Sequence, residues 1–229
     1  ARRSRTVRPA CATVIAKRSG QVPDGSLPRT FPLMRQLFSA ADRTALLGTT
    51  RPGDADPYVQ LLTAAAAAYP QAGLMSQVSY AEARTYMHDV LLRDTDQMTM
   101  AHGLEARVPL LDHRLVEYVM GLPDERKEPG ATPKRLLVES LGDRLPAECV
   151  YRPKQGFVLP FDRWMRSELR SFCEHHLGPA GLAGRGMFRP SAVSALWQAF
   201  SEGSPRTTWS RPWALVALDS WIERNRLTT

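Results

Sequence analysis

The spacing of hydrophobic and polar positions predicts a chain built mainly from helices. Apolar residues recur every three or four positions over residues 31–47, which indicates one helical stretch. A second helix is expected over 56–69, with Asp56 as its N-cap and a proline at its first position. A longer helix is expected over 79–102, because its apolar positions share a face and Gly103 ends the pattern.

The second half of the chain shows the same helical pattern after one short interruption. Residues 104–111 are expected to be extended, and Asp112 is expected to cap a helix that runs through Met120. Further helices are predicted over 132–141, 146–151, around Trp164 and Leu169, and over 190–200 and 209–224. There is no internal repeat and no strand–helix–strand alternation, so the predicted fold class is mostly α.

Tryptophans gather near the end of the chain at helical spacing. These are Trp197, Trp209, Trp213 and Trp221. Large aromatic side chains at such intervals are typical of core packing, and we favour that role over base stacking.

Composition and charge narrow the class of protein. The hydrophobic fraction of 43% in 229 residues can form a core, and no apolar run is long enough to span a membrane. Residues 1–53 carry ten basic and two acidic residues, whereas the remainder carries 20 and 21. We therefore predict a basic loop or tail over 1–30 and a main domain over 31–226. Binding of nucleic acid or anionic lipid by the basic end is an alternative to a simple solvated segment.

The cysteines and histidines give no metal or disulfide signature. Cys11, Cys149 and Cys173 are odd in number and far apart, so a disulfide framework and a structural zinc site are not expected. A reducing cytoplasm fits this usage best. His175 and His176 are adjacent and should face different ways on a helix, so no metal site is predicted there. Residues 9–16 are too short an apolar run for a signal peptide.

Three segments carry candidate chemistry, and the first is the end of the long predicted helix. Asp94 and Asp96 are two residues apart, so they point to different faces and cannot act as a paired acid and base. The ordinary interpretation is a salt-bridged helix surface. The alternative is that Asp96 is partly buried with a charged partner.

The second segment places Glu105 and Arg107 in the predicted extended run. Residues two apart in such a run share a face, so a fixed acid–base pair beside a core is expected. That pair could be purely structural. The sharper interpretation is a phosphate-positioning arginine held by Glu105, because a guanidinium grips phosphate oxygens bidentately.

The third segment is YRPKQGF, residues 151–157. Pro153 stiffens this loop and Gly156 permits unusual backbone angles, so Lys154 is expected at the tip of a constrained turn. The chain has only four lysines against 26 arginines. A compact ammonium charge here suggests phosphate neutralisation, with an exposed turn as the alternative.

Together these segments resemble the C-terminal synthetase domain of glutamine-dependent asparagine synthetases. That family shows a block of the type D-x-x-S-M-A-x-x-x-E-x-R-x-P-F-L-D-x-x-L-V-E, which here reads DQMTMAHGLEARVPLLDHRLVE from Asp96 to Glu117. Its R-P-K-x-G-F loop matches Arg152–Phe157. The resemblance implies the helical C-terminal part of an α/β adenine-nucleotide α-hydrolase-like (ATP pyrophosphatase) synthetase domain, with the parallel sheet upstream.

The resemblance also implies an activity and a set of roles. The family uses ATP and Mg²⁺ to adenylate the side-chain carboxylate of aspartate, and ammonia from an N-terminal glutaminase domain then forms the amide. Lys154 matches the active-site lysine that contacts phosphate. Glu105 and Arg107 match residues that shape the nucleotide or substrate site, and Asp96 is expected to orient an arginine or the loop. The family likeness implies neither membrane nor nucleic acid as a partner, and leaves a homodimer open.

The chain departs from the family pattern in several places. The pyrophosphate loop S-G-G-x-D-S, the block S-G-x-G-x-D-E and the glutaminase cysteine are absent, and Gln97 stands where the family usually has arginine. We therefore expect a fragment of a longer protein that is inactive when isolated. Two alternatives remain: a related ligase that forms a β-lactam or macrolactam, and an inactive helical module that binds a partner.

Overall fold

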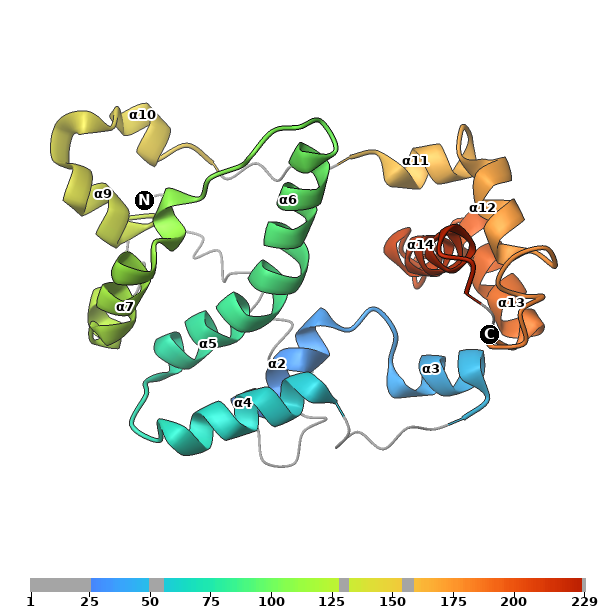
Figure 1. The fold of residues 1–229 in the computed structure, drawn as a ribbon, viewed down its shortest axis with the longest axis horizontal. Coiled ribbons are helices and arrows are strands. Elements are labelled where there is room, and N and C mark those ends of the chain that lie inside the picture. The colour runs from blue at the N-terminus through green and yellow to red at the C-terminus, as the bar shows by residue number, and fades with distance from the viewer. Residues whose placement is uncertain (1–25, 50–55, 128–131, 154–158, 228–229) are drawn as a thin grey trace, which may run out of the picture. The chain divides into compact units, whose positions relative to one another are not determined.

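The structure, a computed structural model, describes residues 26–49, 56–127, 132–153 and 159–227 (Figure 1). All regular elements in these ranges are helices, which confirms the prediction of a mostly α fold. No helix within the described ranges is both long and apolar enough to cross a membrane. Residues 1–25 of the predicted basic tail and Lys154 lie outside the described residues, and α2 already begins at Leu27.

The chain forms two compact units, and each is built from separated stretches of sequence. The first unit takes residues 1–35 and 54–155, and the second takes 36–53 and 156–229. The described helices of the first unit are α2 (Leu27–Arg35), α4 (Pro57–Ala68), α5 (Leu74–Glu82), η2 (Ala83–Leu92), α6 (Arg93–Met100), η3 (Pro109–Leu111), α7 (His113–Gly121), α8 (Asp124–Lys127), α9 (Arg135–Leu141), η4 (Gly142–Arg144) and α10 (Ala147–Val150). Those of the second are α3 (Ala40–Leu47), α11 (Phe161–Arg166), α12 (Arg170–Leu177), α13 (Pro190–Ser201) and α14 (Ser210–Arg224).

A small core joins α2, α4 and α5 in the first unit. Phe31, Leu62 and Ala81 are buried together, one from each helix. Asp56 caps α4 as predicted, since its carboxylate accepts a hydrogen bond from the backbone N–H of Tyr58 at 2.9 Å. Three buried side chains give little apolar burial, so polar contacts must help to hold these helices in register.

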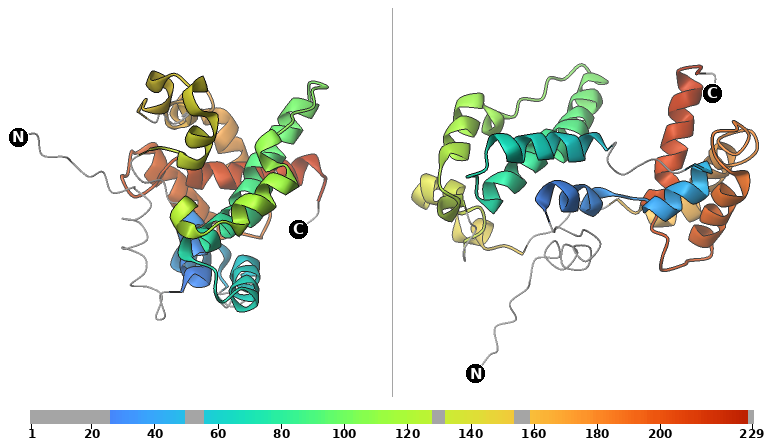
Figure 2. Two further views of the ribbon diagram at one scale, coloured as in Figure 1. Left: turned by 90° about the vertical axis from the view of Figure 1, so that its left-hand side faces the viewer. Right: turned by 90° about the horizontal axis from the view of Figure 1, so that it is seen from below.

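One continuous helical rod runs over residues 74–100 and dominates the first unit (Figures 1 and 2). It consists of α5, the π-helical segment η2 and α6. The rod confirms the long predicted helix, although it begins earlier, at Leu74. Gly103 has a φ of +68° just beyond its end, where glycine is favoured because it has no Cβ. The π-helical middle widens the turn, a feature that is found frequently at functional sites.

Side-chain contacts brace the middle of this rod against the neighbouring helices. The Tyr58 hydroxyl on α4 donates a 2.6 Å hydrogen bond to Asp89, which raises the pKa of Tyr58 to about 12. Arg35 on α2 pairs with Glu82 and lies over the Tyr86 ring, with its guanidinium carbon 4.3 Å from the ring centroid. These contacts link α2 and α4 to successive turns of the rod.

The segment after the rod corrects one prediction. Residues 104–108 have no regular structure and 109–111 form a 3₁₀ turn, so the predicted extended run is only partly correct. Pro109 explains the change, because its fixed φ suits the first position of a helical turn. Asp112 caps α7 as predicted, accepting from the backbone N–H of Arg114 at 3.0 Å. The last predicted helices of this unit, α9 and α10, are present, and α9 starts at Arg135.

The second unit has the larger hydrophobic core. Its fully buried members come from α11, α12, α13 and α14 and the loop before α13, and include Met165, Leu182, Val193, Phe200 and Val216. Three of the four tryptophans predicted as core residues, Trp197, Trp209 and Trp213, pack against this core. Trp221 is 55% exposed, so its predicted core role is wrong. One helix was expected around Trp164 and Leu169, whereas two, α11 and α12, are found.

The predicted single helix over residues 31–47 is in fact divided between the two units. Ser39 starts α3 with a capping box, in which its hydroxyl accepts from the Asp42 N–H and Asp42 accepts from the Ser39 N–H. Leu46 then enters the core of the second unit, and its carbonyl accepts from the Arg189 N–H at 2.7 Å. Apolar periodicity continued across the break, and the serine cap was the missed signal.

Substitution of Leu182 by alanine tests whether the buried apolar cluster stabilises the second unit. Leu182 is fully buried, whereas Leu47 is 37% exposed. Leu182→Ala should lower the free energy of unfolding of this unit by about 2–5 kcal/mol, because it removes transfer energy and leaves a cavity. Leu47→Ala should cost less than about 1 kcal/mol. All five tryptophans lie in the second unit, so urea unfolding followed by tryptophan fluorescence makes the comparison. Equal losses for the two variants would contradict this account of the core.

Candidate functional site

Asp96 lies on the last helix of the rod, and the structure does not support the alternative that it is partly buried with a charged partner. Its side chain is exposed, and within the described ranges it forms no ion pair. Its backbone carbonyl accepts a hydrogen bond from the Thr99 hydroxyl at 3.2 Å. Asp94 is also exposed, so this end of the rod presents separate carboxylates to solvent rather than a buried acid–base pair.

Glu105 and Arg107 come together as predicted. The Arg107 Nη2 atom lies 3.0 Å from Glu105 Oε1, and the side chains are 82% and 67% exposed for Arg107 and Glu105, respectively. The expected position beside a core is therefore wrong, because residues 101–110 are all exposed. An exposed pair of this kind contributes only about 0–1 kcal/mol to stability. Its consequence is geometric: Glu105 restrains a guanidinium whose donors face solvent.

The loop that carries Lys154 is described only up to Pro153. Tyr151, Arg152 and Pro153 are exposed, and the loop follows the short helix α10 of the first unit. The predicted position of Lys154 at the tip of a constrained turn, and its predicted contact with phosphate, therefore stay predictions.

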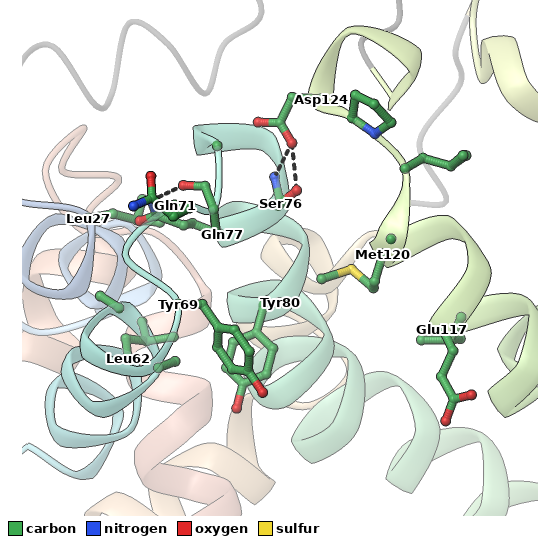
Figure 3. Close-up of a pocket in the computed structure, with 18 of the residues that line it drawn as sticks. Leu27, Leu62, Tyr69, Gln71, Ser76, Gln77, Tyr80, Glu117, Met120 and Asp124 are labelled. Atoms are coloured by element: carbon green, nitrogen blue, oxygen red, sulfur yellow. Dashed lines mark hydrogen bonds between the residues drawn. The ribbon is translucent and has the colours of Figure 1, made fainter.

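A pocket of about 730 Å³ opens in the first unit, and sequence patterns did not reveal it (Figure 3). It lies among α2, α4, α5, α7 and the turn that precedes α8. Its apolar wall includes Leu27, Leu62 and Met120, and Tyr69, Gln77 and Glu117 add polar groups. These side chains come from separate stretches of the chain, so no local motif could have indicated the cavity.

The lining of this pocket includes a carboxylate, that of Asp124, which caps α5. Gly73 precedes α5 and offers no capping side chain, and Asp124 supplies the cap from a position 49 residues beyond Met75. The carboxylate accepts from the backbone N–H groups of Met75 at 2.8 Å and Ser76 at 3.1 Å, and from the Ser76 hydroxyl at 2.5 Å. The hydrogen bond from the Ser76 hydroxyl is the main reason that the pKa of Asp124 lies below its ordinary value.

Two neighbours complete this capping network. The Lys127 side chain is 5% exposed, and its ammonium lies 3.5 Å from Asp124 Oδ1 and also donates to the Ser76 hydroxyl and to the Met120 carbonyl. Gly73 leaves room for the carboxylate, since a Cβ there would lie 2.1 Å from Asp124 Oδ2. The Ser76–Lys127 contact could suggest a nucleophile and its base. Because the hydroxyl donates to Asp124 and the ammonium is paired with that carboxylate, the network is structural instead.

The Asp124 cap gives the first unit a stability that depends on pH. Asp124→Asn should lower the free energy of unfolding of this unit by about 1–3 kcal/mol, because it weakens the cap and leaves Lys127 unpaired. The pKa is lowered on folding, so the wild-type advantage should be complete above the ordinary value of 3.8 and decline as pH falls below it.

The unfolding of the first unit can be followed by tyrosine absorbance, because all six tyrosines lie in it. Glu125→Gln is the matched control, since Glu125 is exposed one residue away. A wild-type advantage over Asp124→Asn that persists unchanged at pH 2.5 would contradict the assigned role.

Comparison with known proteins identifies the family to which these residues belong. Residues 8–223 match the family described as asparagine synthase. Asparagine synthetase (glutamine-hydrolyzing) 1 of Bacillus subtilis is 33% identical over 98 residues, or 43% of this chain and 16% of that protein. The human glutamine-hydrolyzing asparagine synthetase is 38% identical over 105 residues, or 43% and 18%. The matched part of this chain thus spans less than a fifth of either relative. No solved structure matches.

Proposed function

The chain belongs to the asparagine synthase family, and from that premise we propose that it is part of a ligase that makes an amide at the expense of ATP. The proposed substrate is aspartate. Its side-chain carboxylate attacks the α-phosphorus of ATP and displaces pyrophosphate, and ammonia then attacks the acyl carbon and displaces AMP. Glutamine is the proposed source of ammonia, because the relatives' names describe them as glutamine-hydrolyzing.

The observation that carries this proposal is the exposed Glu105–Arg107 pair within the family match. Arg107 presents a planar donor fork to solvent while Glu105 restrains it at 3.0 Å. A guanidinium in this state suits the bidentate recognition of phosphate oxygens. We therefore assign Arg107 to a phosphate of ATP, and Glu105 to positioning Arg107.

Lys154 is proposed as the second phosphate contact and the catalytic residue. Its ammonium would neutralise charge that develops as pyrophosphate leaves. Mg²⁺ would arrive with ATP, because this ion is usually held by substrate phosphates together with one or two carboxylates. We assign Asp96, an exposed carboxylate on the rod, to orienting an arginine or the loop that carries Lys154. Cys149 and Cys173 are free thiols, which fits the reducing cytoplasm in which we propose that the enzyme works.

Aspartate-dependent exchange of labelled pyrophosphate into ATP tests this function. The assay should use the protein translated from the whole reading frame that contains these 229 residues. Exchange that requires aspartate is the expected result. Exchange that requires a different carboxylic acid would instead support the lactam-forming alternative, and absence of exchange would support a helical module without activity.

Lys154→Ala should reduce this exchange by about 100-fold or more, because it removes phosphate charge neutralisation. Lys134→Ala is the matched control, since Lys134 is an exposed lysine of the same unit. The control should retain exchange. If both variants exchange at the wild-type rate, Lys154 does not contact phosphate.

A further inference from the structure

Three metal-binding side chains meet at one end of the second unit. His175 and His176 lie in the last turn of α12, and Glu223 lies in the last turn of α14. One ligand atom from each lies within 4.8 Å of the other two. The centroids of the two adjacent histidine rings lie 5.1 Å apart. The rings are therefore close together, although neighbouring side chains on a helix were expected to face different ways. Among the described residues, these form the one group of three or more such side chains that converges in this way.

The central ring of this group is fixed by a buried carboxylate. His176 Nδ1 lies 2.8 Å from Asp219 Oδ2, and these side chains are 4% and 1% exposed. Arg185 Nε donates to the other oxygen of Asp219 at 2.5 Å, so the carboxylate is compensated. A carboxylate on one imidazole nitrogen fixes the tautomer and directs the other nitrogen, Nε2, toward a ligand.

The loop after α12 closes tightly around this carboxylate. A Cβ at Gly181 would lie 2.2 Å from the His176 carbonyl and 2.8 Å from Asp219 Oδ2, so only glycine fits. The Leu182 N–H donates to the same carbonyl at 2.8 Å. The loop thus fixes the His176 backbone and packs against Asp219, which holds the ring, whereas His175 and Glu223 are exposed.

Direct hydrogen bonding does not explain the position of Glu223. Its Oε2 atom lies 3.8 Å from His176 Nδ1, which is too far for a hydrogen bond. Ligand atoms at about 2.0–2.1 Å from a tetrahedral zinc ion lie about 3.4 Å from one another. The observed spread of up to 4.8 Å is wider than that spacing, so the exposed His175 and Glu223 side chains must rotate toward His176 Nε2 when an ion binds.

We propose that His175, His176 and Glu223 bind a zinc ion, with Asp219 as the positioning residue for His176. Two imidazoles and one carboxylate suit a borderline ion such as Zn²⁺, whereas Mg²⁺ prefers oxygen ligands. Three protein ligands leave one coordination position for water or an external ligand. The ion ties the end of α12 to the end of α14, so its binding stabilises the second unit. This site is independent of the proposed ligase function.

Zinc titration of the untagged full chain tests the site. The parent and all variants carry Cys149→Ser, which removes an exposed thiol. One Zn²⁺ per chain should bind, and Mg²⁺ should not compete. The same sample with Co²⁺ should show the visible absorption of a four- or five-coordinate ion. Saturation with Zn²⁺ should shift urea unfolding, followed by tryptophan fluorescence, to higher denaturant concentration, because the ion binds only the folded unit.

His175→Ala and Glu223→Gln should each weaken zinc affinity by about 100-fold, an effect at the upper end of those seen even for outer-shell partners. Both residues are exposed, so the tryptophan emission of the metal-free variants should match that of the parent. His113→Ala and Glu202→Gln change exposed residues elsewhere and should keep full affinity. Failure of the parent to bind zinc, or unchanged affinity in a chain carrying both His175→Ala and Glu223→Gln, would overturn the proposal.

Discussion

The capping of α5 by Asp124 is the interaction on which the first unit depends. Four N–H groups at a helix start need acceptors, and Gly73 supplies no side chain, so the cap comes from α8. That contact fixes where the helical rod begins. Because the helical rod continues without interruption to residue 100, its start also sets the register of the helix that carries Asp96. The same capping residues, Gly73, Ser76 and Asp124, also line the pocket.

The two units are stabilised in different ways. Among its described residues, the first has a core of three buried apolar side chains, and many of its large apolar side chains, such as Leu104, Leu110 and Tyr118, are more than 60% exposed. Polar contacts such as the Tyr58–Asp89 hydrogen bond therefore help to determine how the helices of this unit pack against one another. Within the part of the second unit that the structure describes, ten apolar residues are buried in one cluster, so hydrophobic burial contributes more to the stability of that unit than polar contacts do.

Local sequence signals predicted those parts of the fold that depend on neighbours along the chain. Caps at Asp56 and Asp112, the stop at Gly103 and the pairing of Glu105 with Arg107 all act within a few residues, so their patterns are readable. Contacts over long sequence separations were not predictable in this way. Nothing near Gly73 indicates a cap 51 residues later, and apolar periodicity alone does not reveal that α2 and α3 enter different units. The prediction that Trp221 is buried failed for a related reason. Trp221 fits a helical apolar pattern, but the packing of α14 leaves this residue 55% exposed.

The buried Asp219 and His176 side chains of the second unit have an energetic cost that apolar packing does not explain. Burying Asp219 and His176 removes both from water, and such pairs often contribute less than well-packed apolar residues would. Arg185 offsets part of that cost, because it gives the carboxylate a charged partner in addition to the imidazole. A purely structural pair would need no exposed histidine and glutamate beside it. A device that holds one imidazole nitrogen so that the other can bind an ion accounts for the buried carboxylate, the fixed ring and the two exposed side chains together.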